Sequence, residues 1–84
     1  MKKTARFAAR NQIGARVRQA RLSCSPPVSQ EDLAGRLAAQ GISMDRTAIS
    51  RIEKRSRYVM DYEVSAIARA LKVSVAWLFA EAVD

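Results

Sequence analysis

The polar side chains best suited to recognition chemistry lie between Asp45 and Glu53. Ala48, Ile49 and Ile52 follow the spacing of the buried face of a helix. The opposite face of that helix presents four polar side chains: Arg46, Thr47, Ser50 and Arg51. A helix fits the major groove of B-DNA, where Arg donates two hydrogen bonds to guanine and a hydroxyl bonds to several bases. The pattern therefore predicts a helix that contacts DNA bases; the alternative is an ordinary solvated polar face.

Composition argues against most catalytic and metal chemistry. The 84-residue chain has no histidine and a single cysteine, Cys24. The lack of histidine excludes a His general base, a Ser–His triad and His-ligated zinc. A lone cysteine forms neither an internal disulfide nor a cysteine metal cluster, so we expect Cys24 to be a buried or partly exposed free thiol. The chain also lacks a Gly-rich phosphate loop, and we expect a binding protein with no enzymatic activity, metal or cofactor.

The charge balance points to a polyanionic partner. Fifteen Lys and Arg against eight Asp and Glu give a net charge of +7 and a pI near 10.5. On a small domain this charge favours nucleic acid or an anionic membrane surface. Residues 1–10 form a basic N-terminal arm that either reaches along DNA or is a solvated tail. Its cationic residues are Lys2, Lys3, Arg6 and Arg10.

Hydropathy predicts no membrane-spanning segment, and we expect no membrane partner. No segment approaches about 18 consecutive apolar residues, the length that a membrane-spanning helix needs. The N-terminal charges are not followed by an apolar run, so they do not form a secretory signal. We therefore expect a cytoplasmic protein.

Apolar spacing and capping residues predict the first two helices. The first runs from about Asn11 to Ser23, because Pro26 and Pro27 prevent its continuation. The second starts at Ser29, which forms a capping box with Asp32, and ends at Gly41. The apolar stripe of the second helix is Leu33, Ala34, Leu37 and Ala38.

Three further helices complete the predicted fold. Asp45 caps the helix that ends at Glu53, Asp61 caps a fourth helix, and a short fifth helix starts at Ser74. The fourth helix has the apolar stripe Val64, Ile67, Ala68 and Leu71. With 49% hydrophobic residues, the chain is expected to be one all-α domain, a compact bundle of five short helices around one core.

Large apolar residues crowd the predicted fifth helix. A short terminal helix of a small protein needs less apolar surface for its own packing than is provided by Trp77, Leu78 and Phe79. Core packing accounts for some of them, and a homodimer interface is expected to account for the rest.

Several segments resemble one known family. SQEDLA at residues 29–34 and TAISRIE at residues 47–53 are similar to the helix-turn-helix of the Cro/phage-repressor (Xre-type) family. IGARVRQAR at residues 13–21, YEVSAIARALKVS at residues 62–74 and VAWLF at residues 75–79 extend this likeness. The resemblance covers roughly residues 11–80. It implies a lambda-repressor-like DNA-binding domain, preceded by the arm and followed by a C-terminal tail at residues 81–84.

The resemblance also implies a role for individual residues. A member of this family would regulate transcription, most often as a repressor, and bind double-stranded DNA as a homodimer. The positions that would contact bases are Arg46, Thr47 and Arg51, with Ser50 nearby. The positions that would contact phosphates are Ser29, Gln30, Lys54, Arg55 and Arg57. Arg21 and Glu53 match a structural pair that joins the first and third helices.

Two connections are longer than the family pattern. Residues 38–44 add about one helical turn before the recognition helix, and residues 23–27 lengthen the first connection as a surface loop. A second class of function also remains: a protein-interaction module, such as an antitoxin-like partner that uses the hydrophobic C-terminal helix. RNA binding is less favoured, since the chain has no stacking sheet or aromatic platform.

Overall fold

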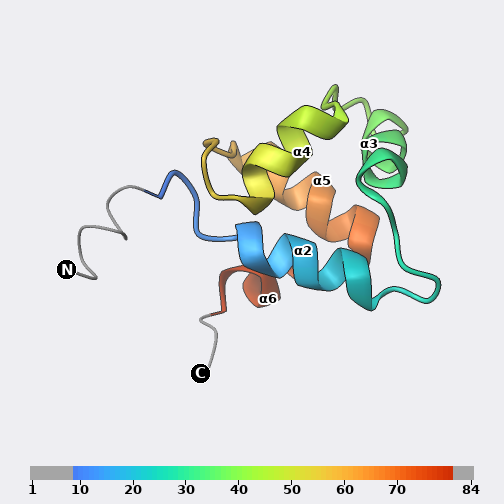
Figure 1. The fold of residues 1–84 in the computed structure, drawn as a ribbon, viewed down its shortest axis with the longest axis horizontal. Coiled ribbons are helices and arrows are strands. Elements are labelled where there is room, and N and C mark those ends of the chain that lie inside the picture. Colours follow the sequence, from blue (N-terminus) through green and yellow to red (C-terminus); the bar gives the residue numbers. More distant parts are fainter. Residues whose placement is uncertain (1–8, 81–84) are drawn as a thin grey trace.

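Residues 9–80 of the chain, as described by the computed structural model, form five helices and no strand (Figure 1). The helices are α2 (Gly14–Ser23), α3 (Gln30–Ala38), α4 (Arg46–Glu53), α5 (Asp61–Leu71) and α6 (Val75–Phe79). The predicted all-α bundle is confirmed. Lys2, Lys3 and Arg6 of the predicted arm, and the predicted tail at residues 81–84, lie outside the described residues.

Side-chain caps fix where three of the helices begin. The Ser29 hydroxyl accepts a hydrogen bond from the Asp32 N–H at 2.9 Å, and the Asp32 carboxylate accepts one from the Ser29 N–H at 3.3 Å. The Asp45 carboxylate accepts the Ala48 N–H at 2.8 Å, and the Ser74 hydroxyl accepts the Trp77 N–H at 2.9 Å. Each cap satisfies a donor that has no partner within its helix. The predicted starts of α3, α4 and α6 are therefore confirmed.

Two predicted helix starts are wrong, the first by about three residues and the second by one. The first helix begins at Gly14, because the Asn11 carboxamide oxygen accepts the N–H groups of Ile13 and Gly14 and so precedes the helix. Asp61 does not cap the fourth helix but is its first residue. Met60 holds the cap position there, and its N–H donates to the Glu63 carboxylate at 3.0 Å. The acidic partner three residues further on fixes this start.

α3 ends at Ala38 and not at the predicted Gly41, which instead closes the turn that follows the helix. The φ of +82° at Gly41 favours glycine, and it lets the Gly41 N–H reach the Ala38 carbonyl and the Ile42 N–H reach the Leu37 carbonyl. Because the chain turns away here, Leu37 is the last side chain of α3 that enters the core. Ala38, which was predicted to belong to the apolar stripe, is exposed instead.

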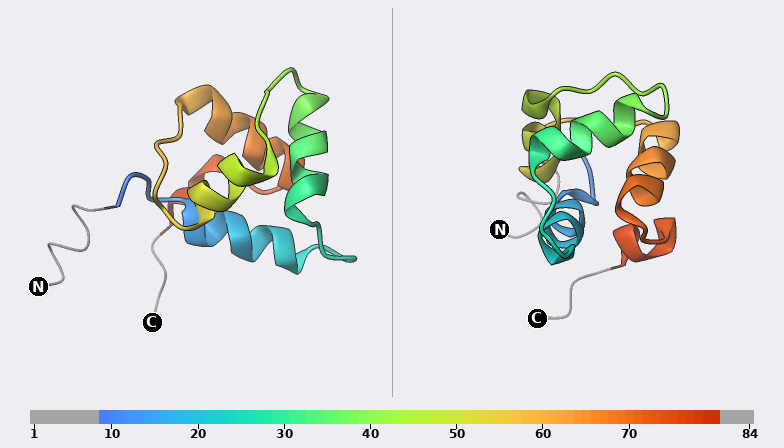
Figure 2. Two further views of the ribbon diagram at one scale, coloured as in Figure 1. Left: turned by 45° about the horizontal axis from the view of Figure 1, so that its top comes forward. Right: turned by 90° about the vertical axis from the view of Figure 1, so that its right-hand side faces the viewer.

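The core lies where all five helices meet (Figure 2). α4 packs on α2 and α3, α5 packs on α2 and α3 from the other side, and α6 packs on α2 and α5. The side chains buried most completely are Ile13, Val17, Leu33, Leu37, Ile49, Ile52, Ile67 and Leu78. Within residues 9–80 no helix is long and apolar enough to cross a membrane.

Leu78 corrects the predicted dimer interface. Its side chain is 0% exposed and belongs to the core, so it is not available to a second copy. α6 has only five residues, and Leu78 is the one buried among them. It closes the core against α2 and α5.

Candidate nucleic-acid interface

The outer side of α4 carries the four predicted base-contact residues. Arg46, Thr47 and Arg51 are exposed and Ser50 is half-buried. We call these four residues the α4 face. On the other side of the helix, Ile49 and Ile52 are 1% and 0% exposed and hold α4 in the core. The amphipathic pattern of this short helix therefore directs its polar residues outward together.

A buried ion pair supports the end of α4. The Arg21 guanidinium donates to both oxygens of the Glu53 carboxylate, at 2.7 Å and 2.9 Å, and to the Val28 carbonyl at 2.9 Å. The Gln30 amide donates to Glu53 at 3.1 Å. The hydrogen bonds from Arg21 to Glu53 raise the pKa of the guanidinium, in opposition to its burial. Glu53 thereby joins α4 to α2 and to the start of α3.

A glycine allows α2 to approach the last turn of α4 closely. A Cβ on Gly14 would lie 2.2 Å from the Ile52 carbonyl oxygen and 2.8 Å from the Arg55 side chain. Either contact is too short for any real side chain. The absence of a side chain at Gly14 therefore sets the depth at which α4 sits against α2.

One shallow groove adjoins the first turn of α4 and the start of α3. It is lined by Arg21, Ser29, Gln30, Glu31 and Arg46. The groove brings two predicted phosphate contacts, Ser29 and Gln30, next to a predicted base contact, Arg46. Both Ser29 and Gln30 also have internal roles, as the cap of α3 and as a donor to Glu53.

A second groove lies along the other edge of α4, and we call it the Arg10 groove. Its lining residues are Arg10, Asp45, Thr47, Ala48, Arg51, Ser56, Arg57 and Tyr58. Two predicted base contacts, Thr47 and Arg51, thus share a surface with residues from outside α4. The carboxylate of Asp45 is already engaged there as the cap of α4.

The basic segment at residues 54–57 divides into engaged and unengaged cations. Arg57 forms a bidentate pair with Glu63, at 3.1 Å and 3.3 Å, and also donates to the Tyr58 carbonyl. Arg55 donates to the Asn11 carbonyl at 3.1 Å. The Lys54 side chain is exposed and makes no hydrogen bond within residues 9–80. Of the three predicted phosphate contacts in this segment, Arg57 makes the most hydrogen bonds within the protein.

The Arg57–Glu63 pair changes the titration of the carboxyl group. Burial alone would raise the pKa of Glu63, but the hydrogen bonds from Arg57 and the Met60 N–H, with the charge of Arg57, outweigh it. The pKa of Glu63 is therefore held below its ordinary value. The pair connects the segment after α4 to the start of α5.

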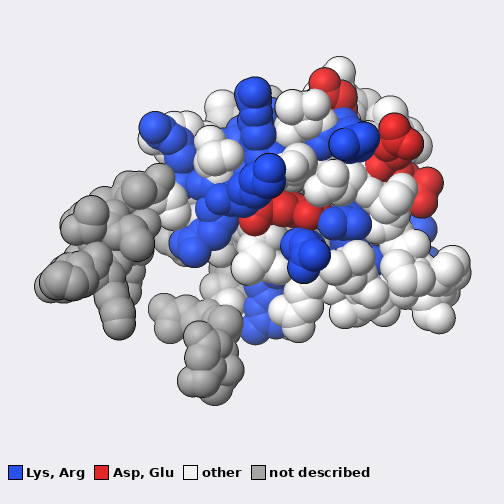
Figure 3. All heavy atoms as spheres, viewed as in Figure 1, with Lys and Arg blue, Asp and Glu red and all other residues white. Residues whose placement is uncertain are grey.

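Positive charge gathers over α4 and the segment that follows it (Figure 3). Within residues 9–80 two ion pairs form, Arg21–Glu53 and Arg57–Glu63. Neither involves a cation of the α4 face, so Arg46 and Arg51 keep their guanidinium donors for an external acceptor. In the described part of the chain, no three His, Cys, Asp or Glu side chains lie together as metal ligands.

Three residues, Arg10, Asn11 and Tyr58, shape this surface through contacts that sequence reasoning missed. The Asn11 carboxamide oxygen accepts the Gly14 N–H just before α2, and its amide group donates to the carbonyls of Ile52 and Arg57. Arg10, which was predicted to belong to the N-terminal arm, donates its N–H to the Arg55 carbonyl and its guanidinium to the Tyr58 hydroxyl, both at 2.9 Å. An Asn just before a predicted helix is a signal for the first of these roles.

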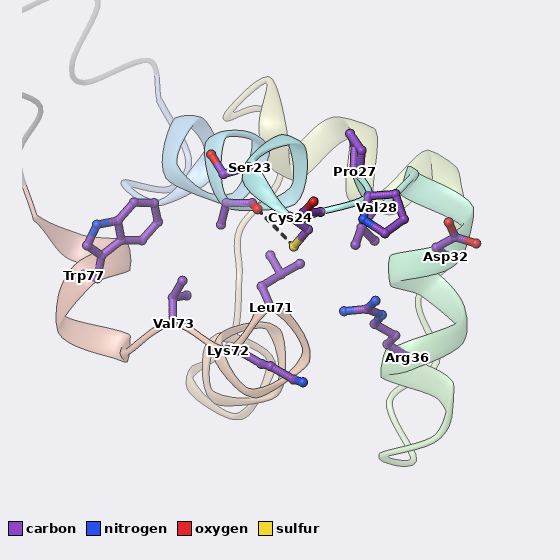
Figure 4. A pocket seen from close by; sticks show the side chains of 13 residues that line it. Ser23, Cys24, Pro27, Val28, Asp32, Arg36, Leu71, Lys72, Val73 and Trp77 are labelled. Atoms are coloured by element: carbon purple, nitrogen blue, oxygen red, sulfur yellow. Dashed lines mark hydrogen bonds between the residues drawn. The ribbon is translucent and has the colours of Figure 1, made fainter.

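A further cavity is on another part of the molecule, between the end of α2, α3 and the end of α5 (Figure 4). It has a volume of about 620 Å³. Several of its polar groups are already bonded internally: the Cys24 thiol donates to the Ala20 carbonyl at 3.3 Å, and Arg36 donates to the Ala70 carbonyl at 2.9 Å. Cys24 is a half-buried free thiol, as predicted. Arg36 and Cys24 are therefore engaged within the protein, unlike Arg46 and Arg51 of the α4 face.

The other two predicted dimer residues differ in exposure. Phe79 is 47% exposed, and Val75, one turn earlier on α6, is 41% exposed. Trp77 is half-buried, with the Arg16 guanidinium 4.3 Å from the centre of its ring. α6 thus presents an apolar edge at Val75 and Phe79.

Comparisons of the chain with protein-family models, curated proteins and solved structures gave no match.

Proposed function

We propose that this chain is a sequence-specific, double-stranded DNA-binding regulator of transcription, in which α3 and α4 act as a helix-turn-helix. One observation carries the proposal: α4 is anchored by Ile49 and Ile52 while its outer face exposes Arg46, Thr47 and Arg51. A core-anchored helix with uncommitted donors on its outer face matches the requirements of major-groove recognition.

Base recognition falls to the α4 face. Arg46 and Arg51 donate bidentate hydrogen bonds to guanine, and Thr47 contacts a base through its hydroxyl or methyl group. Ser50, which is small and half-buried, permits close approach of the helix to the groove floor. The bidentate hold of Arg21 and Gln30 on Glu53 keeps α4 at a fixed angle to α3.

Phosphate contacts set the register of the protein on the duplex. Ser29 and Gln30 lie at the N-terminus of α3, where unpaired N–H groups and the helix dipole favour an anion. Lys54 and Arg55, which follow the C-terminus of α4, contact phosphates of the DNA backbone there. Since each neutralised phosphate releases counterions, affinity falls steeply as salt increases.

The proposed assembly is a homodimer that represses transcription by occupying two half-sites. The exposed edge of α6, at Val75 and Phe79 with Trp77 beside them, supports a two-fold contact. A dimer of this kind reads half-sites about one helical turn apart. The same exposed edge supports the second candidate, a protein-interaction module, in which a different protein occupies α6.

Selection of bound duplexes from a random pool, at near-physiological salt, tests the proposal. The expected result is an inverted repeat whose half-sites are centred about one helical turn apart. Arg46→Ala and Arg51→Ala should each relax the preference at one position of each half-site. Lys72→Ala removes the same charge at the end of α5, beside the cavity, and should leave the selected sequence unchanged.

Two results would contradict parts of the proposal. Binding without any enriched sequence would leave only non-specific attraction by the basic charge. Two findings together would contradict the proposed homodimer. They are enrichment of a single, non-repeated site, and a monomeric mass in solution for both the wild type and Phe79→Ala. Loss of a co-purifying protein on Phe79→Ala would instead support the interaction-module function.

A further inference from the structure

We propose that the Arg10 groove is a seat for one backbone phosphate of bound nucleic acid, in which Arg10 is the ligand and Tyr58 is the residue that positions it. This inference rests on the proposed function, since it assigns a further contact to the same DNA-binding surface. Arg10 was expected only as part of the N-terminal arm, and Tyr58 was assigned no contact.

Arg10 is held against the segment after α4 at two points. Its backbone N–H donates to the Arg55 carbonyl at 2.9 Å, which fixes the chain at this residue. Its guanidinium donates to the Tyr58 hydroxyl at 2.9 Å and lies 5.1 Å from the centre of the Tyr58 ring. An arginine held in this way loses little conformational freedom when it binds an anion.

The bond to Tyr58 leaves most of the Arg10 donors unused. A guanidinium has five N–H groups, of which one is bonded to the hydroxyl. Within residues 9–80 no carboxylate forms an ion pair with Arg10. Its charge and its planar pair of N–H groups are therefore available, and they match the geometry of a phosphodiester.

The position of the groove selects a phosphate over a base. Thr47 and Arg51 of the α4 face line the groove together with Arg10. When these two side chains face the major groove of the DNA, the phosphate backbone of the DNA strand that borders the major groove runs along the edge of α4. Arg10 lies at this edge. Arg57 lines the same groove, but its guanidinium is held by Glu63. Since Arg51 is assigned to a base, Arg10 is the remaining cation of the groove with unused donors.

The first test measures the salt dependence of binding for the full chain. Arg10→Ala should weaken binding to any duplex about tenfold and reduce the slope of log affinity against log salt by roughly 0.9. Tyr58→Phe keeps the ring but loses the hydroxyl, so it should have a smaller effect, and Tyr58→Ala should approach the effect of Arg10→Ala. Arg69→Ala, which loses a similar exposed hydrogen bond on α5, is the matched control and should leave the slope unchanged.

The second test locates the phosphate. Each phosphate of the selected site is replaced in turn by a neutral methylphosphonate, and affinities are compared for the wild type and Arg10→Ala. At one position per half-site the replacement should weaken the wild type about tenfold but leave Arg10→Ala unchanged, since the contact is already lost. Thermal denaturation of each variant checks that the exposed substitution leaves the fold intact.

The outcomes separate this inference from the proposed function. A selected sequence with no methylphosphonate position coupled to Arg10, or an unchanged salt slope in Arg10→Ala, would overturn the phosphate seat and leave specific recognition standing. No selected sequence, with a reduced slope in Arg10→Ala on an arbitrary duplex, would support the seat and overturn specific recognition. An equal loss for Tyr58→Phe and Tyr58→Ala would assign the positioning to the hydroxyl alone.

Discussion

The α4 face and the surface formed by α3 and α5 both carry cations, but these cations are engaged differently. On the α3–α5 surface, Arg36 donates to the Ala70 carbonyl at 2.9 Å and Arg69 donates to the Gln40 side chain at 2.7 Å. Arg46 and Arg51 of the α4 face make no side-chain hydrogen bond within residues 9–80. Net charge favours a polyanionic partner in general, whereas the uncommitted donors are the reason why the α4 face is proposed as the surface that binds it.

The two surfaces also rest on different supports. Behind the α4 face lie two fully buried isoleucines and the Arg21–Glu53 pair. Beside Arg36 lies the open cavity that contains the half-buried Cys24. A rigid support limits the entropy lost when side chains bind a target, so the difference favours α4 as the recognition element. The following predictions test this comparison, from the largest expected effect to the smallest.

Glu53→Gln should have the largest effect, because it removes the support of α4. The Arg21 and Glu53 side chains are 9% and 4% exposed. Loss of the carboxylate leaves Arg21 as an uncompensated buried charge, which costs about 3–5 kcal/mol of unfolding free energy. Urea denaturation measures this loss. Glu31→Gln changes an exposed acid at the start of α3 and should shift stability by less than about 0.5 kcal/mol.

Gly14→Ala should cost about 1–3 kcal/mol of unfolding free energy, since the added Cβ would meet the Ile52 carbonyl at 2.2 Å. Gly35→Ala is the matched control on α3, where a Cβ would have no neighbour within 4 Å. There the substitution should stabilise the protein by about 0.5–1 kcal/mol, because alanine favours a helix over glycine. Equal effects of the two substitutions in thermal or urea denaturation would show that α2 and α4 do not approach so closely.

Some of the structural features behind these predictions could be predicted from the sequence, and others could not. The starts of α3 and α4 could be predicted, since Ser29 and Asp45 act on N–H groups three residues away. The burial of Leu78 could not, because five residues are too few to show a helical period. Arg10 and Tyr58 are 48 residues apart, and no local pattern relates them.

Ion pairs show the same limit. The Arg21–Glu53 pair spans 32 residues, so no local pattern predicts it, and it was anticipated only through family resemblance. The Arg57–Glu63 pair spans only six residues but was not anticipated, since Arg57 was predicted to contact a phosphate. Local capping is therefore readable from single residues, whereas the engagement of a charge depends on the fold around it.

Arg51→Ala tests the comparison directly through DNA affinity. It should cost about 1–3 kcal/mol of binding free energy on the selected site and relax the preference at one base pair. Arg36→Ala removes the same charge from the α3–α5 surface and should leave both the affinity and the preferred sequence nearly unchanged. Fluorescence anisotropy with a labelled duplex measures both. Similar losses for the two variants would mean that the long-range field, rather than the α4 face, governs binding.

Glu63→Gln should have the smallest effect, and a pH-dependent one. The pKa of Glu63 is lowered in the folded protein. Its contribution to stability is therefore fully present above the ordinary glutamate value of about 4.3 and is lost as the pH falls through the lower folded value. The Arg57 side chain is 32% exposed, so solvent weakens the ion pair. We therefore expect the unfolding free energy of the wild type to exceed that of Glu63→Gln by about 1 kcal/mol at neutral pH.

The difference between these two proteins should shrink as the pH falls below about 4 and vanish once the carboxyl group is protonated in the folded state. Urea denaturation between about pH 2.5 and 7 measures it. A difference that stays constant with pH would mean that Glu63 acts through packing and not through its charge. Glu63→Gln also releases Arg57 into the Arg10 groove, so the salt slope of DNA binding should rise, by at most about one. An unchanged slope would show that Arg10 alone serves the phosphate.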